Sequence, residues 1–206
     1  MLKMAIRNQY SFYHVLSANT MIVKPLEEVL AFFEETPEKN YLEFNRLPEG
    51  EENIIAPWYI YYHFLHIYDK RTNLGNQFDW YFCKIQKKLG IKRKLEFKYK
   101  GLVYAHLTHD CLKYILHYLK KNPKFFNSLR TCNIGEEFFF QNIIATSPFK
   151  EYVINDNKIY TKWTEGGVAK FLIEKDLDEI LKSNCLFARK YNEKSRELIR
   201  RLDVYK

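Results

Sequence analysis

The pattern of hydrophobic and polar positions predicts a strand, a helix and a second strand near the start of the chain. Residues 11–17 are aromatic or apolar on both faces, which is typical of a buried strand in a mostly parallel sheet. Pro25 then marks a helix start, and apolar side chains follow at the spacing of one helical face as far as Phe33. Residues 41–44 favour a short second strand. A strand followed by a helix is half of a βαβ unit.

The middle of the chain predicts two helices with marked ends. Residues 99–107 indicate a strand, and Thr108 after it is a good N-cap. The helix that follows has one apolar stripe, formed by Leu112, Ile115, Leu116 and Leu119. A second helix opens with Glu136 and Glu137 and carries apolar pairs four residues apart. It ends before Ser147-Pro148, because proline pushes its predecessor out of the helical region.

The closing third predicts short elements rich in charge. Residues 151–162 indicate two strands around an Asn155-Asp156-Asn157 turn, and Trp163 ends the second strand. A short helix follows at 177–181. Residues 196–201 form a basic amphipathic helix, a pattern typical of a surface face and also of a membrane-proximal patch.

Composition limits the class of protein. The chain has 206 residues, enough for one domain spanning 1–206. Its net charge of +8 suits nucleic acid, an anionic membrane or a phosphate-bearing substrate. The aromatic residues follow no nucleic-acid signature, so we expect no nucleic-acid partner. A basic run at 87–100 favours a solvated face.

Cysteine usage and hydropathy bear on the compartment. The four cysteines are scattered without a C-x-x-C pair, which indicates reduced thiols rather than disulfides or a zinc ribbon. Residues 1–8 lack the apolar core of a signal peptide, and no run approaches the length of a membrane span. We therefore expect a cytoplasmic protein, with the inner face of the membrane as a second location.

Two sets of residues are candidates for chemistry. Glu136 and Glu137 sit at the positive end of a helix dipole, which suits a general base and equally an ordinary acidic first turn. The histidines, with Asp110, raise the alternative of a metal-dependent HD-type phosphohydrolase. They are His63 and His66 at i, i+3, His106 and His109. Asp110 is explained by the Thr108 cap and no second acidic ligand has a telling spacing, so we expect no metal.

Three further motifs, in order, resemble one family. Residues 135–150 contain EEFFFQNII and SPFK, residues 159–163 are IYTKW, and residues 175–191 contain KDL and LFARKY. These are similar to segments of the core-2/I-branching β-1,6-N-acetylglucosaminyltransferases, especially their bacterial members. Residues 13–17 and 101–116 also resemble that family. The chain departs from it at Ala18, Thr20, Ile22, Leu102 and Val103.

The resemblance implies a function and a site. It implies a GT-A-type α/β fold with a mostly parallel central sheet, and inverting, metal-independent transfer of N-acetylglucosamine or a related sugar. The donor would be a nucleotide sugar, expected to be UDP-linked, and the acceptor a glycan or glycolipid. Glu137 matches the catalytic base and Lys190 the diphosphate-binding lysine, with Arg189 or Lys170 as the second cation. Trp163 and Glu136 fall at the acceptor.

Two other functions stay open from the sequence. Without activity, the chain would be a glycan-binding remnant that keeps Trp163 as a stacking platform for sugar C–H faces. The basic surface also allows an adaptor that contacts an anionic membrane peripherally. The N-terminal nucleotide-binding strands of the GT-A fold find no counterpart in residues 1–10, because a βαβ unit needs about thirty residues. We therefore expect weak donor binding by these residues alone and an exposed apolar sheet edge.

Overall fold

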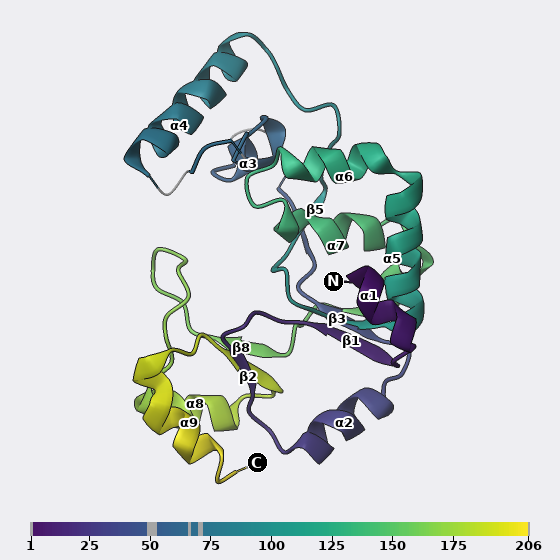
Figure 1. Cartoon of the computed structure of the whole chain (residues 1–206), viewed down its shortest axis with the longest axis vertical. Helices are drawn as coiled ribbons and strands as arrows, with labels where there is room; N and C mark the ends of the chain where they lie inside the picture. Colours follow the sequence, from purple (N-terminus) through teal and green to yellow (C-terminus); the bar gives the residue numbers. More distant parts are fainter. Residues whose placement is uncertain (1, 49–52, 66, 70–71, 206) are drawn as a thin grey trace.

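The computed structural model describes residues 2–48, 53–65, 67–69 and 72–205, and shows an α/β protein with mixed sheets (Figure 1). The α-helices are α1 (Leu2–Ala5), α2 (Leu26–Glu34), α3 (Ala56–Ile60), α4 (Asn73–Lys88), α5 (His109–Lys121), α6 (Pro123–Arg130), α7 (Glu136–Ile144), α8 (Leu177–Lys182) and α9 (Arg196–Leu202). Short 3-10 helices are η1 (Ile6–Asn8), η2 (Pro148–Tyr152), η3 (Glu174–Asp176) and η4 (Glu193–Ser195).

The strands form three small sheets. They are β1 (Phe12–Val15), β2 (Thr20–Ile22), β3 (Asn40–Leu42), β4 (Asn45–Arg46), β5 (Tyr99–Lys100), β6 (Ala105–Thr108), β7 (Val153–Ile154), β8 (Ile159–Thr161) and β9 (Phe187–Arg189). The first sheet has the order β1-β6-β3-β7, the second β2-β9-β8, and β4 pairs with β5. Helices α5, α6 and α7 lie on one side of the first sheet, and α8 and α9 lie by the second (Figure 1).

The prediction of a mostly parallel sheet is wrong for the described strands. Only β3 with β7 and β8 with β9 run parallel, whereas β1 and β3 are both antiparallel to β6. The apolar character of residues 12–16 has another cause. Tyr13 packs into the main core, while Phe12 joins a second cluster around Phe33 on the other face of β1. Burial on both faces therefore does not require parallel neighbours.

Several local predictions are confirmed. Pro25 is the N-cap of α2, whose buried residues are Val29 and Phe33. The Thr108 hydroxyl accepts a hydrogen bond from the Cys111 N–H and caps α5. Helix α7 ends just before Ser147-Pro148, as proline chemistry requires.

Other predicted elements are divided or displaced. Residues 99–107 fall in two strands of different sheets, β5 and β6. Gly101 lies between them, where a Cβ would be 1.9 Å from the Glu43 carbonyl oxygen, so only glycine lets the chain pass that backbone. The two strands at 151–162 also belong to different sheets, β7 beside β3 and β8 beside β9. Helix α3 ends at Ile60, so His63 lies outside it; His66 lies outside the described residues.

The basic run at 87–100 is not solvated throughout. Arg93 is buried, and its guanidinium donates hydrogen bonds to the carbonyl oxygens of Tyr59, Tyr61, Ser128 and Thr131 at 2.7–2.9 Å. These bonds join the segment after α3 to the end of α6. Arginine suits this position because its five donors have a fixed planar geometry.

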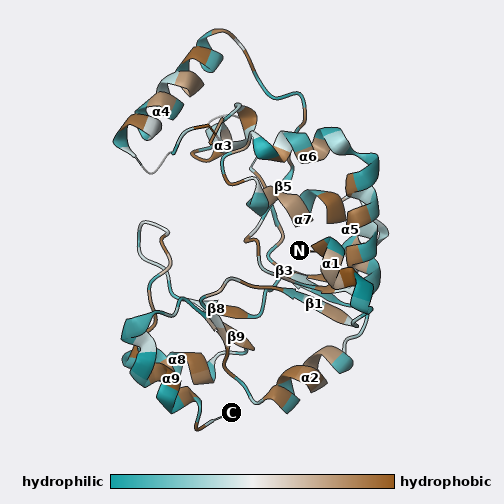
Figure 2. Ribbon diagram, in the orientation of Figure 1, coloured by the Kyte–Doolittle hydropathy of each residue, from teal (hydrophilic) through white to brown (hydrophobic). Residues whose placement is uncertain are grey.

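The main core lies between α5, α7 and the first sheet. Phe138, Ile143 and Ile144 of α7 are fully buried there, and Figure 2 shows the hydrophobic colour of this helix. A third cluster lies under α8 and α9, around Leu172 and Leu198. All four cysteines are described and are free thiols. Of the helices described, none combines the length and hydrophobicity that crossing a membrane requires.

Candidate functional site

Helix α7 directs its two opening carboxylates to different places. Oε2 of Glu137 lies 2.6 Å from Nζ of Lys100, on β5, and both side chains are about three-quarters buried (22% and 25% exposed). Glu136, one residue earlier, is exposed and lines the large groove described below. A turn of about 100° per residue separates the two side chains.

Hydrogen bonds hold α7 against the segment that follows β5. Gln141 is fully buried, and its amide nitrogen donates to the carbonyl oxygens of Glu43 and Leu102, each at 3.1 Å. The Gly101 N–H donates to the Glu137 carbonyl oxygen at 3.0 Å. Gly101 and Gln141 both match the family motifs, and the structure gives them a shared positioning role.

The three predicted diphosphate-binding cations lie on neighbouring segments at the second sheet. Arg189 ends β9 and Lys190 follows it, with Nζ of Lys190 4.8 Å from the centre of the Phe171 ring. Lys170 is exposed and precedes Phe171 in the chain. The Leu172 N–H donates to the Lys190 carbonyl oxygen at 2.9 Å, so the segment that carries Lys170 runs beside the end of β9.

Arg189 and Lys190 are half-buried cations with no carboxylate partner among the described residues. The Nε of Arg189 is buried and has no hydrogen-bond acceptor in that part of the chain, and the same holds for the Thr161 hydroxyl. Thr161 is the register partner of Arg189 across β8 and β9. The Arg189 guanidinium lies 4.7 Å from the Tyr104 ring centre, so the ring covers one of its faces.

The neighbouring Lys162 behaves differently. Its Nζ contacts Asp176 at 2.7 Å and Glu179 at 2.9 Å, and hydrogen bonds to these carboxylates raise its pKa. Asp176 also accepts the Ile173 N–H, so it caps the segment before α8. Asp176 therefore has a structural role at the start of α8.

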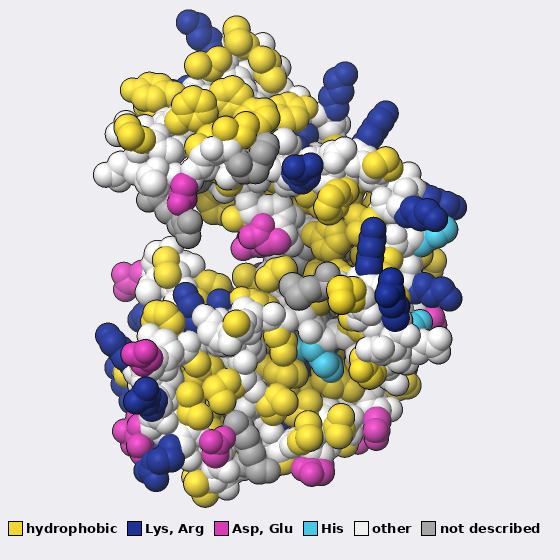
Figure 3. Space-filling model, in the orientation of Figure 1, with side chains coloured by type: hydrophobic (Ala, Val, Ile, Leu, Met, Phe, Trp, Pro, Cys, Tyr) yellow, Lys and Arg dark blue, Asp and Glu magenta, His cyan; other side chains and the backbone are white. Residues whose placement is uncertain are grey.

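Trp163 lies at the base of a β-hairpin beside these cations. It forms an antiparallel bridge with Ala169, and Gly167 at the tip has φ +73°. The indole is 44% exposed, which leaves a ring surface accessible. Figure 3 shows a notch between this part of the molecule and the part that carries α3 and α4.

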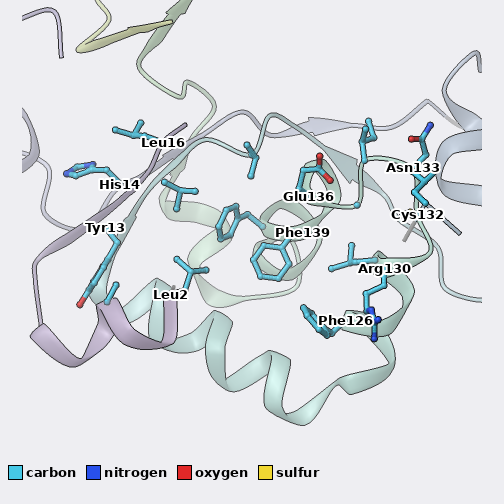
Figure 4. Close-up of a pocket in the computed structure, with 18 of the residues that line it drawn as sticks. Leu2, Tyr13, His14, Leu16, Phe126, Arg130, Cys132, Asn133, Glu136 and Phe139 are labelled. Carbon is cyan, nitrogen blue, oxygen red and sulfur yellow. The ribbon is translucent and has the colours of Figure 1, made fainter. Parts of the chain in front are cut away.

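A large open groove runs along β1, with a volume of about 1600 Å³. Its lining is mainly apolar, with Leu2, Phe126 and Phe139 among the contributors (Figure 4). Glu136 and Arg130 are charged members of the lining. β1 is an edge strand of its sheet, and residues 12–16 face this groove.

Two histidines meet across β1 and β6. Nδ1 of His14 lies 2.7 Å from Nδ1 of His106, and Nε2 of His106 lies 2.9 Å from the Asn157 carbonyl oxygen. Burial, and then the nearby His14, lower the pKa of His106 to about 3. His106 is therefore neutral, with Nε2–H donating to Asn157 and Nδ1 accepting from His14. The ring is a core hydrogen-bonding group and does not join His63 or His109 in a metal site.

A different cluster has the residue types of a metal site. His63, Asp79 and Cys83 place one potential ligand atom each within 4.8 Å of one another. Nδ1 of His63 lies 2.8 Å from Asp79 Oδ1 and 3.9 Å from Cys83 Sγ, while Nε2 lies 2.9 Å from the Pro57 carbonyl oxygen. Zinc takes such ligands, and a backbone carbonyl commonly orients the second nitrogen.

Protonation of His63 also satisfies the hydrogen-bonding groups of this cluster, without a metal ion. Burial alone lowers the pKa of His63, but hydrogen bonds with Asp79, Cys83 and Pro57 raise it to about 9. The imidazolium then donates to Asp79 from Nδ1 and to Pro57 from Nε2, so both nitrogens are used. We interpret the cluster as a buried ion pair. In the sequence, the only sign of this cluster is the four-residue spacing of Asp79 and Cys83, which places both side chains on one face of a helix.

A scan of protein-family models and a search of curated proteins gave no match to this chain.

Proposed function

We propose that this protein is an inverting, metal-independent glycosyltransferase. It would transfer N-acetylglucosamine or a related sugar from a nucleotide-sugar donor to a glycan or glycolipid. The observation that carries the proposal is the arrangement of Arg189 and Lys190. Two adjacent, half-buried cations have no anionic partner among the described residues, and beside them the Thr161 hydroxyl is buried without a partner. Burying charge without compensation is costly, which favours an external anion.

A nucleoside diphosphate has the chemistry that such a site would bind. Its leaving group gains negative charge as the sugar departs, and fixed cations stabilise that charge. Arg189 supplies planar N–H donors and Lys190 a point charge. Lys170 lies near enough along the hairpin to add a third, solvent-exposed cation. In this proposal the three side chains do the work that a metal ion does in other transferases.

The acceptor side of the proposal uses α7 and the groove. Glu137 would accept the proton of the acceptor hydroxyl through Oε1, because the contact to Lys100 uses Oε2. Glu136 lines the apolar groove and would hold acceptor hydroxyl groups, while the groove suits the apolar part of a glycolipid. The exposed ring of Trp163 would cover a sugar face.

A second candidate function is glycan binding without transfer. The Lys100 ion pair favours it, because Oε2 of Glu137 already has a cationic partner at 2.6 Å. In that case Trp163 would still bind sugars and the carboxylate would have only a structural role.

One experiment separates the two candidates. The chain is incubated with radiolabelled UDP-N-acetylglucosamine, a set of glycan and glycolipid acceptors, and a chelator. Labelled product supports the transferase. Glycan binding that depends on Trp163, with no labelled product, supports the remnant. An absence of both contradicts both.

A further inference from the structure

Helix α4 carries its apolar side chains on the outside of the molecule. Leu74, Phe78, Tyr81 and Ile85 follow one another at intervals of four, three and four residues, and Leu89 continues the series. These five side chains, which we call the α4 stripe, are 54–80% exposed. Figure 3 shows a continuous hydrophobic surface at the upper left, over the position of α4 in Figure 1.

Polar side chains hold α4 to the rest of the protein. Its buried residues are Gly75, Asp79 and Gln86. Gln86 exchanges two hydrogen bonds of 2.9 Å with the backbone of Tyr62, and Asp79 contacts His63 at 2.8 Å. The most buried positions of α4 are therefore largely polar, the reverse of a usual amphipathic helix. Among the described residues, apolar contacts are few: Phe82 lies against Phe64, with ring centres 5.4 Å apart, and Phe78 of the stripe lies against Tyr68 at 4.9 Å.

The free flank of the stripe is positively charged. Lys84, Lys87 and Lys88 are exposed. Helical periodicity places Lys84 and Lys88 opposite Asp79 and Gln86, with Lys87 on the flank between. Asp79 is the only acidic residue between 73 and 94, and it is buried. Nζ of Lys84 lies 3.5 Å from the centre of the Trp80 ring. An aromatic ring beside lysine is an arrangement suited to a lipid headgroup layer.

We propose that α4 docks on an anionic lipid surface, lying in the plane of the membrane with its stripe among the acyl chains. Helix α4 is about 24 Å long at 1.5 Å per residue, which is enough for a stable interfacial contact. Lys84 and Lys88, which flank the stripe, then lie at the level of the phosphates, with Tyr81 at the boundary. This inference stands on the surface of α4 and does not rest on the proposed function.

Charge and composition favour lipid over a protein partner. Two copies that met through the stripe would bring two sets of three lysines together without intervening carboxylates, which opposes self-association. Protein interfaces also contain hydrogen-bonding groups, at about one bond per 100–200 Å². The stripe offers only the Tyr81 hydroxyl. A lipid surface needs no such pairing.

Vesicle co-sedimentation tests the proposal. The 206-residue chain is mixed with vesicles of phosphatidylcholine alone or with about 30% phosphatidylglycerol. We expect it to sediment with the anionic vesicles and to be released at about 1 M salt. In a Trp58→Phe, Trp163→Phe variant, the remaining Trp80 emission should move to shorter wavelength when anionic vesicles are added.

Matched variants assign the contact to α4. Replacing Leu74, Tyr81 and Ile85 by glutamine should abolish sedimentation and leave the circular dichroism unchanged, because these side chains are exposed. Replacing Lys84, Lys87 and Lys88 by glutamine should weaken partitioning about ten-fold or more. Replacing Lys113, Lys120 and Lys121 of α5 removes the same charge elsewhere and should have little effect.

Three results would overturn the proposal. Equal sedimentation with neutral and anionic vesicles would remove the role of charge. Equal losses from the α4 and α5 lysine variants would show a diffuse electrostatic effect. A dimer in sedimentation velocity that the glutamine stripe variant dissociates, without vesicle binding by the original chain, would identify a second copy as the partner.

Discussion

Nζ of Lys100 lies 2.6 Å from Oε2 of Glu137, and this ion pair joins β5 to the first turn of α7. It places a cation beside the carboxylate that the proposal assigns as the base. Lys100 would have to shift, or to leave Oε1 to the acceptor, for proton transfer to occur. The neighbouring Glu136 faces the groove instead, so the two carboxylates can be distinguished by substitution.

Glu137→Gln should lower the transfer rate by about two orders of magnitude or more, the size typical of losing general-base catalysis. Folding should change little, because a partly exposed ion pair contributes about 1 kcal/mol or less. The measurements are the transfer rate with labelled donor and a urea unfolding curve. Glu136→Gln is the matched control: an equal loss of rate there, or full activity in Glu137→Gln, rules out Glu137 as the base.

Lys190→Ala should weaken nucleoside diphosphate binding and slow transfer together, because the lysine would stabilise the charge of the leaving group. Phosphorus NMR titration with UDP detects the binding even when it is weak. Added magnesium should not restore either quantity. Lys124→Ala, on α6, removes the same charge from an exposed position and serves as the control. A chelator that abolishes wild-type activity would contradict the metal-free mechanism.

The His63–Asp79 pair predicts a pH dependence of stability. The pKa of His63 is raised from 6.5 to about 9 in the folded protein, so the folded state binds this proton more tightly. The stabilisation is complete below pH 6.5 and is lost as the pH rises through about 9. Urea unfolding between these values should show the decline. His63→Gln should remove this component, and His117→Gln, at an exposed position of α5, should not.

The effect of added zinc on the melting temperature tells whether the His63, Asp79 and Cys83 cluster binds a proton or a metal ion. If His63, Asp79 and Cys83 bind a proton rather than a metal, added zinc leaves the melting temperature unchanged. A rise in melting temperature that Cys83→Ser abolishes would show a metal site instead.

Arg93→Lys should destabilise the fold by about 2–4 kcal/mol, because a lysine cannot reach the four backbone carbonyl groups that the guanidinium bonds and leaves some of them buried without a donor. Chemical unfolding measures this change. Lys94→Gln alters the next residue, which is exposed, and should fall within about 0.5 kcal/mol of the original chain. Similar values for the two variants would contradict the role of Arg93.

Local chemistry made part of the fold predictable. The Thr108 cap and the Ser147-Pro148 stop act within a few residues, so the bounds of α5 and α7 follow from the sequence. The direction of β1 does not. It depends on pairing with β6, more than ninety residues away, as in Tyr13 with Leu107. Apolar side chains on both faces fit either direction.

Charge patterns were the least predictable. Arg93 and Lys94 lie in one basic run, yet Arg93 is buried and Lys94 is exposed. The difference depends on carbonyl groups brought near by the fold. Similarly, Asp79 and Cys83 gain His63 as a neighbour only through tertiary contact. The spacing of the α4 stripe indicates a helix, but not that its apolar face is outward.

The sequence pointed to some of the candidate site residues and missed others that depend on tertiary contact. The resemblance points to Lys190, with Lys170 or Arg189 as a substitute for a second cation, and in the structure Lys190 follows β9 and lies beside Phe171, the residue after Lys170. It did not point to Lys100, whose contact with Glu137 joins two segments 37 residues apart in the sequence. Thr161 was also missed, because its relation to Arg189 is set by strand register.

The stereochemistry of the product tests the proposed transfer most directly. The chain is incubated with UDP-N-acetylglucosamine, whose sugar is α-linked, in the presence of a chelator, and proton NMR identifies the new anomeric centre. We predict a β-linked product that forms with the original chain and is nearly absent with Glu137→Gln. An α-linked product, or no product from any glycan or glycolipid acceptor, would contradict the assignment of an inverting, metal-independent glycosyltransferase.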